Sequence, residues 1–144
     1  MYKKILVPLD GSATAMMAAA QAIDIAEKYS AQVTLLHVCP NFNFMNEFSM
    51  HAAIDYTQLK EEFTVQGEKI LADALAKFPD TQVNINKKLV WGYPSEEIIQ
   101  EANEGGYDLI VTGSRGLSAI KGYLMGSVSN RVTKHAPCPV LVVR

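Results

Sequence analysis

The chain has 144 residues, of which 49% are hydrophobic and 19% charged, and its formal net charge is -2. These values are typical of one globular domain, 1–144, and they exclude a disordered chain. No segment is rich enough in Lys and Arg to indicate a nucleic-acid partner. No apolar run approaches the roughly 20 residues that span a bilayer, so we expect no membrane partner.

The first strand is predicted in the opening segment, MYKKILVPLDGS, whose apolar run 5–7 ends at Pro8. A short continuous apolar run is typical of a strand buried on both faces. The run is too short for the core of a signal peptide, so we expect a cytoplasmic location. Apolar residues at helical spacing follow within 12–29, and Ser12 can cap that helix.

Residues 33–38 predict a second strand. The segment 40–55 that follows is irregular and longer than most strand-to-helix connections. It could pack on a partner subunit, cover a helix edge or fold over a ligand. A helix that Pro79 stops should come next. One stripe of that helix is apolar, made of Leu59, Phe63, Ile70, Ala74 and Phe78.

Partial alternation of apolar residues within 83–90 predicts a third strand. Proline followed by acidic residues then marks a helix start, because both suit the first turn of a helix. The remaining predicted elements are a helix from Pro94 to Gly105–Gly106, a strand at 108–112, a helix from near Gly126 to Pro137 and a strand at 138–143.

This alternation of strands and helices predicts an α/β fold, an open five-stranded parallel sheet with helices on both faces. Ligands of such folds bind beyond the carboxyl ends of the strands. Asp10–Ser12, Val38–Cys39 and the segment from Gly113 onward all follow predicted strands. We therefore expect these three segments to meet at one crevice.

The segment GSRGLSAIKGYLMGSVSN, 113–130, is rich in glycine. Glycine permits positive φ and allows a ligand to approach the backbone closely. A helix that begins near Gly126 would direct free amides and its dipole at an anion, and the hydroxyls of Ser127 and Ser129 could add hydrogen bonds. A mobile surface loop is the simpler alternative. The segment lacks the Walker lysine, and the dinucleotide glycine motif is also missing after the first strand.

The spacing of this segment is Gly, two residues, Gly, nine residues, Gly and Ser, from Gly113 to Ser127. With the ILVPLDGS opening, the LHV end of the second strand, the DLIV strand and the PCPVLVV ending, the pattern resembles the ATP-binding members of the universal stress protein family. The resemblance covers the whole chain. It implies a Rossmann-like, adenine nucleotide α-hydrolase-like sheet with strand order 3-2-1-4-5.

The resemblance also implies an ATP site. Asp10 would accept hydrogen bonds from the ribose, and the Val38 backbone would read the adenine edge. Mg²⁺ would be held by the phosphates, because no acidic cluster is visible in the sequence. The implied ATP-binding residues are Pro8, Leu9, Asp10, Val38, Thr112, Gly113, Arg115, Gly116, Gly126, Ser127, Val128 and Ser129.

Two of these residues also have a simpler interpretation that involves no ligand. Asp10 could be a turn or helix-capping aspartate, and Arg115 could be a solvated surface charge. We expect no catalytic residue and at most slow ATP hydrolysis, because the chain shows no clear general base and no lysine that matches a phosphoryl-transfer motif. The favoured function is an ATP-binding regulatory protein of the stress response. The alternatives are a slow metal-dependent ATPase or nucleotidyl transferase and a nucleotide-free interaction protein.

The last predicted strand is apolar and is expected at an edge of the sheet. An unprotected apolar edge invites pairing with a second copy of the chain. The family resemblance implies the same assembly, a homodimer joined through Val140, Leu141, Val142 and Val143. The cysteines, Cys39 and Cys138, have no metal-binding spacing and are expected to be free thiols.

Overall fold

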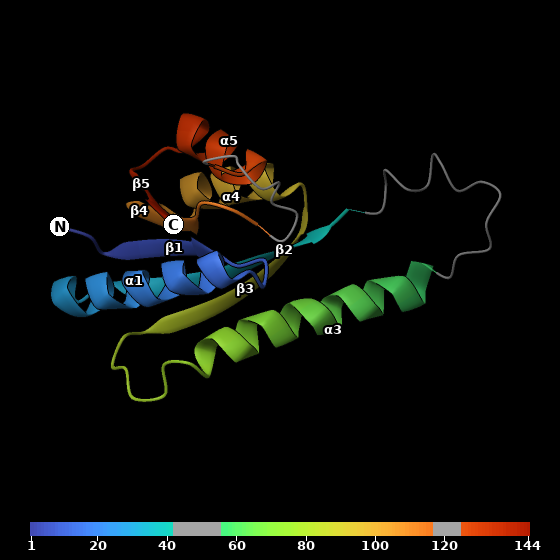
Figure 1. Ribbon diagram of the computed structural model, residues 1–144, viewed down its shortest axis with the longest axis horizontal. Coiled ribbons are helices and arrows are strands. Elements are labelled where there is room, and N and C mark those ends of the chain that lie inside the picture. Colours follow the sequence, from blue (N-terminus) through green and yellow to red (C-terminus); the bar gives the residue numbers. More distant parts are fainter. Residues whose placement is uncertain (42–55, 117–124) are drawn as a thin grey trace.

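The computed structural model describes residues 1–41, 56–116 and 125–144. Its five strands form one parallel sheet in the order β3-β2-β1-β4-β5, which confirms the predicted architecture and strand order (Figure 1). The strands are β1 (Lys4–Pro8), β2 (Gln32–Pro40), β3 (Ile85–Gly92), β4 (Leu109–Gly113) and β5 (Val140–Val143).

Helices cover both faces of the sheet, as the alternation of elements predicts (Figure 1). Residues of α1 and α3 belong to one apolar core, and residues of α4 and α5 belong to the other. The helices of the described residues are α1 (Ala13–Tyr29), α3 (Tyr56–Leu75), α4 (Pro94–Glu104) and α5 (Ser127–His135).

The central strand β1 joins the two cores. Ile5, Leu6 and Val7 are all completely buried. Ile5 and Val7 face the core that contains α1, whereas Leu6 faces the core that contains α4. Because successive side chains of a strand point to opposite faces, a strand covered on both faces must be apolar at every position.

The small side chains of α1 allow this helix to pack closely on the sheet. Its buried face consists largely of alanines, among them Ala18, Ala22 and Ala26. Ser12 caps the helix as predicted, since its Oγ accepts a hydrogen bond from the Ala15 amide at 3.2 Å. The capped end of α1 lies at the carboxyl end of β1, so it points toward the predicted crevice.

The structure differs from the prediction at the end of α3. The helix ends at Leu75 rather than beside Pro79, so Phe78 lies beyond it. The amides of Lys77 and Phe78 bond to carbonyls three residues back, which tightens the chain into turns. Phe78 still packs against the core, so an apolar residue is needed at this position. Its position in the sequence fits the apolar stripe of the helix, which is why the prediction placed it there.

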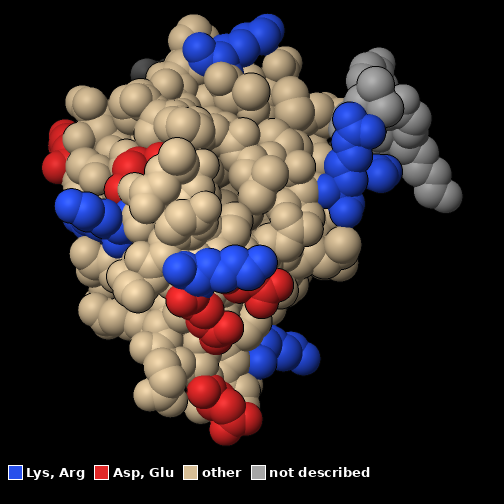
Figure 2. Space-filling view, turned by 90° about the vertical axis from the view of Figure 1, so that its left-hand side faces the viewer, with Lys and Arg blue, Asp and Glu red and all other residues tan. Residues whose placement is uncertain are grey.

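The exposed surface carries charges of both signs. Figure 2 shows Lys and Arg side chains interspersed with Asp and Glu side chains over one face of the molecule. Among the described helices, none combines the length and the apolar character that crossing a membrane requires.

Candidate functional site

A cleft with a volume of about 600 Å³ lies at the carboxyl ends of β1, β2 and β4. All twelve residues predicted for the ATP site line it, so the structure brings the three predicted segments together. They are Pro8, Leu9, Asp10, Val38, Thr112, Gly113, Arg115, Gly116, Gly126, Ser127, Val128 and Ser129. Its volume lies within the usual range of small-molecule sites.

Six further residues line the cleft and were not predicted as site residues. They are Ser12, Ala15, Leu36, Pro94, Ile98 and Met125. Three of them, Ser12, Ala15 and Pro94, belong to the first turns of α1 and α4 or cap such a turn, which the sequence marks through Ser12 and Pro94. The sequence also predicts that the segment with Ser12 reaches the crevice, but only the folded structure shows that the start of α4 at Pro94 does.

The lining of the cleft is chemically mixed. Its apolar part includes Leu36 and Val38 from β2 and Ile98 from α4, which belong to or pack against one apolar core, together with Pro94. Its polar part includes Asp10, the 113–116 turn and the first turn of α5. Such a cleft suits a ligand with a flat apolar group joined to a polar, anionic group.

Asp10 holds the turn that leads into α1 and also lines the cleft. Its Oδ1 accepts a hydrogen bond from the Ser12 amide at 2.9 Å, and Gly11 between them has a φ of +87°. The turn role considered for Asp10 is therefore confirmed. This role fixes the orientation of the carboxylate at the mouth of the cleft.

The glycines at 113 and 116 lie close to other parts of the site. A Cβ on Gly116 would lie 2.7 Å from Asp10 Oδ2, and one on Gly113 would lie 2.7 Å from Thr14 Oγ1. Neither residue, nor Gly126, has a positive φ. Positive φ, one of the two reasons that the sequence suggested for these glycines, therefore does not apply to them.

Backbone hydrogen bonds hold the 113–116 turn in place. The Ser114 carbonyl accepts from the Gly126 amide at 2.6 Å, and the Ser114 amide donates to the Val143 carbonyl at 2.7 Å. The Thr14 hydroxyl donates to the Arg115 carbonyl at 2.5 Å. The turn is thus tied to α1, to β5 and to the start of α5. Ser114 Oγ is buried in it and finds no hydrogen-bond partner among the residues that the structure describes.

The first turn of α5 presents backbone amides that its own helical hydrogen bonds do not use. The Asn130 amide bonds to the Gly126 carbonyl at 3.0 Å, so the amides of 127–129 precede this first helical bond. Gly126 caps the helix without a side-chain hydrogen bond. Ser129 Oγ is less available than predicted, because it is buried and donates to the Gly113 carbonyl at 2.5 Å.

Arg115 lines the cleft and is exposed to solvent. Within the described residues, no group of three His, Cys, Asp or Glu side chains could hold a metal ion. The spacer 117–124, which contains Lys121, and most of the irregular 40–55 segment lie outside the described residues.

Comparison with known proteins decides the family. The model of the universal stress protein family matches residues 1–144. The chain belongs to the universal stress protein family. A curated member, universal stress protein YxiE of Bacillus subtilis, is 35% identical over 150 residues, which cover 100% of both chains.

Solved structures related to this universal stress protein share its fold. Protein MJ0577 matches with a TM-score of 0.83 and 33% identity, over 99% of this chain and 96% of the other. A universal stress protein solved in complex with cAMP matches with a TM-score of 0.75 and 26% identity, over 99% and 97% of the two chains.

Proposed function

We propose that this universal stress protein binds ATP in the cleft and acts as a regulatory protein whose shape or partners depend on the bound nucleotide. The observation that carries the proposal is the meeting of an apolar wall, a fixed carboxylate and a helix N-terminus in one cleft. A related protein solved with cAMP supports an adenine nucleotide as the ligand class.

The residues present fit each part of ATP. Val38 and Ile98 offer an apolar wall for the base, and the Asp10 carboxylate suits the ribose hydroxyls. The amides of 127–129 suit the phosphates, because a helix N-terminus stabilises anions through free N–H groups and its dipole. Mg²⁺ would be held by the phosphates, and Asp10 is the single acidic residue among the described residues that line the cleft.

Gly126→Val tests the assignment of the phosphates to the start of α5. A Cβ at Gly126 meets atoms of the described residues only at 3.4 Å or more, so this part of the protein can accommodate a side chain there while its bulk enters the cleft. We expect ATP with Mg²⁺ to bind wild type and to bind Gly126→Val at least about tenfold more weakly. Ala72→Val adds the same side chain at an exposed position of α3 and should bind as wild type does.

Isothermal titration calorimetry measures these affinities, and mass spectrometry identifies any nucleotide that the purified protein retains. A folded wild-type protein without measurable affinity for ATP would refute the proposal. Equal affinity in Gly126→Val and wild type would contradict only the placement of the phosphates at the start of α5, and ATP binding itself would stand.

We also propose that the protein retains ATP rather than hydrolysing it quickly. Among the described residues that line the cleft there is no lysine, histidine or glutamate, and Asp10 is engaged by the Ser12 amide. Fast hydrolysis requires a positioned water and stabilisation of developing charge. A steady-state turnover of about one per second, lost on substitution of a cleft residue, would favour the ATPase alternative.

Finally, we propose that two copies pair along β5 to form a homodimer. β5 is an edge of the sheet, and Leu141 on it is 36% exposed. Since Ser114 bonds to the Val143 carbonyl, the same edge is joined directly to the 113–116 turn of the cleft. Through this hydrogen bond, a change in the 113–116 turn on nucleotide binding would be passed directly to the dimer edge.

A further inference from the structure

His37 lies behind the cleft and contacts the turn that carries Asp10. Its ring is half-buried in β2, and Nδ1 lies 2.7 Å from the Leu9 carbonyl oxygen. A carbonyl can only accept a hydrogen bond, so Nδ1 carries the proton and donates it. His37 does not line the cleft, whereas Leu9 and Asp10 both do.

This hydrogen bond lies where the sheet ladder ends. The Leu9 amide still bonds to the Leu36 carbonyl of β2 at 2.8 Å, but the chain then turns at Gly11 and leaves the sheet. The Leu9 carbonyl is therefore held by a side chain instead of a neighbouring strand. The peptide that it belongs to is the one that joins Leu9 to Asp10.

The opposite side of the His37 ring is fixed by α3. A Cβ on Gly67 would lie 2.7 Å from His37 Cδ2 and 2.7 Å from Leu89 Cδ1. A glycine inside a helix costs about 1 kcal/mol relative to alanine. At this position it lets the helix pack directly on the imidazole, so the ring has little freedom to rotate away from Leu9.

We infer that His37 is a positioning residue of the nucleotide site, which orients the Leu9–Asp10 peptide, and with it the Asp10 carboxylate, through the Nδ1–H bond to Leu9. The inference rests on the proposed function and concerns a residue that does not touch the nucleotide. It also assigns α3 a part in the site, because the helix holds the ring against Leu9.

The test compares two substitutions in calorimetric titrations with ATP and Mg²⁺. His37→Asn keeps a donor near the position of Nδ1 but fills less space, whereas His37→Leu fills the space and has no donor. If His37 positions the turn, Leu weakens ATP binding about five- to tenfold, the value of one hydrogen bond, and Asn binds ATP more tightly than Leu does. A packing role alone predicts the reverse order.

Nuclear magnetic resonance of the wild-type protein gives a second readout that needs no variant to fold. The neutral His37 ring should be in the Nδ1–H tautomer, and its ring nitrogens should shift as ATP saturates the protein. His135, exposed at the end of α5, is the internal control and should not shift.

The inference fails if His37→Leu binds ATP as wild type does, if Asn is no better than Leu, or if the ring is in the Nε2–H tautomer. In each of these cases wild type still binds ATP, so the proposed function stands. If wild type does not bind ATP, the proposed function fails and this inference fails with it.

Discussion

At the scale of single residues, the site depends on how closely side chains and backbone approach each other. Asp10 and the 113–116 turn come from distant parts of the sequence, yet a Cβ added to Gly116 would lie only 2.7 Å from the Asp10 carboxylate. The spacing of glycines in the sequence predicts this turn, but it does not show what each glycine contacts. Gly113, for example, lies so close to Thr14 of α1 that a Cβ at this position would clash with it.

Gly116→Ala tests the contact with Asp10. The new Cβ would lie 2.7 Å from Oδ2, so something must shift, and the tip of the Asp10 side chain can move more easily than the backbone of the turn. We expect ATP affinity to fall about tenfold, the value of a charge-assisted hydrogen bond, with little change in stability because the residue is exposed. Calorimetric titration and thermal unfolding measure the two effects.

Gly126→Ala is the matched control for protein structure, because its Cβ meets atoms of the described residues only at ordinary contact distances. In the unliganded protein, nuclear magnetic resonance should show the Asp10–Ser12 amides shifted in Gly116→Ala and unchanged in Gly126→Ala. Unshifted amides in Gly116→Ala would mean that the turn, and not Asp10, gives way.

At the scale of elements, the sequence predicted those features that depend on local pattern. A continuous apolar run marked β1, since both faces of this strand are buried. Pro94 and Gly105–Gly106 marked the bounds of α4. The end of α3 was wrong because Phe78 contacts the core after the helix has ended. The roles of Leu36 and His37 depend on contacts between elements, which no local pattern encodes.

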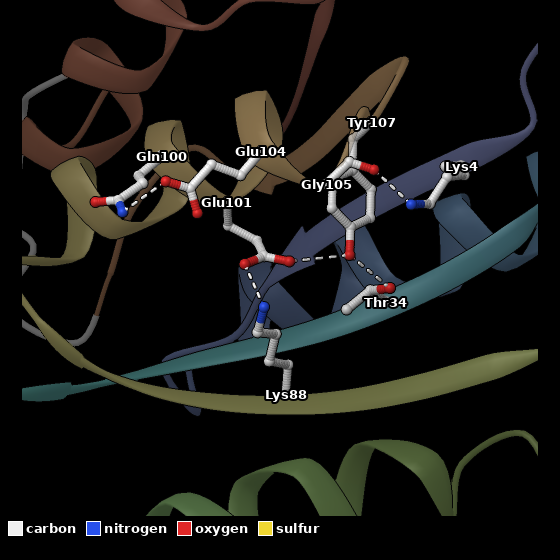
Figure 3. A network of polar contacts seen from close by, with 8 residues as sticks. All are labelled: Lys4, Thr34, Lys88, Gln100, Glu101, Glu104, Gly105 and Tyr107. Carbon is white, nitrogen blue, oxygen red and sulfur yellow. Dashed lines mark hydrogen bonds and ion pairs between the residues drawn. The ribbon is translucent and has the colours of Figure 1, made fainter.

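A polar network joins four elements on the α4 side of the sheet (Figure 3). The Tyr107 hydroxyl lies 2.9 Å from Thr34 Oγ1 of β2 and 3.2 Å from Glu101 Oε1 of α4. Glu101 also forms an ion pair with Lys88 of β3 at 2.6 Å, and Lys4 of β1 donates to the Gly105 carbonyl. The network fixes α4, whose first turn forms part of the cleft wall.

This network predicts a loss of stability at alkaline pH. Burial raises the pKa of Tyr107 above its ordinary value of 10.0, and the hydrogen bond to Glu101 raises the pKa of Lys88 above 10.5. The unfolded chain therefore releases these protons at lower pH than the folded protein does. As pH rises beyond about 10, the free energy of unfolding must fall. Denaturant titrations across this pH range measure the slope.

Tyr107→Phe separates the tyrosine from the other groups. It should lower the free energy of unfolding by about 1 kcal/mol at neutral pH through the lost hydrogen bonds, and it should reduce the alkaline slope. Burial also raises the pKa of the Cys39 and Cys138 thiols, and these contributions persist in the variant. Tyr93→Phe, at an exposed tyrosine, is the control. An unchanged slope in Tyr107→Phe would contradict the assignment.

At the scale of the whole molecule, the sheet has two edges of unlike character. β3 at one edge carries the exposed Lys87 and Lys88. Charged side chains on an edge strand discourage pairing with another strand. β5 at the other edge is apolar along its length. The sequence predicted β5 as an edge strand because it is the last strand, and the topology confirms this position.

The backbone of β5 shows which groups are free for a second copy. The carbonyls of Pro139 and Val143 bond to β4 and the residue that follows it, so the alternate residues Val140 and Val142 direct their N–H and C=O groups outward. Two β5 strands related by a two-fold axis can pair through these groups and extend the sheet. Proline at an outward position removes a donor without breaking a bond to β4.

Val142→Pro therefore tests the proposed dimer while leaving the β4–β5 pairing intact. We expect wild type to sediment as a dimer in analytical ultracentrifugation and Val142→Pro to sediment as a monomer with most of its thermal stability. Val142→Thr keeps the N–H group and the branched shape, so it should remain a dimer. A monomeric wild type would refute the dimer itself. A dimeric Val142→Pro would contradict a role of the Val142 N–H group in the pairing, because proline lacks that donor.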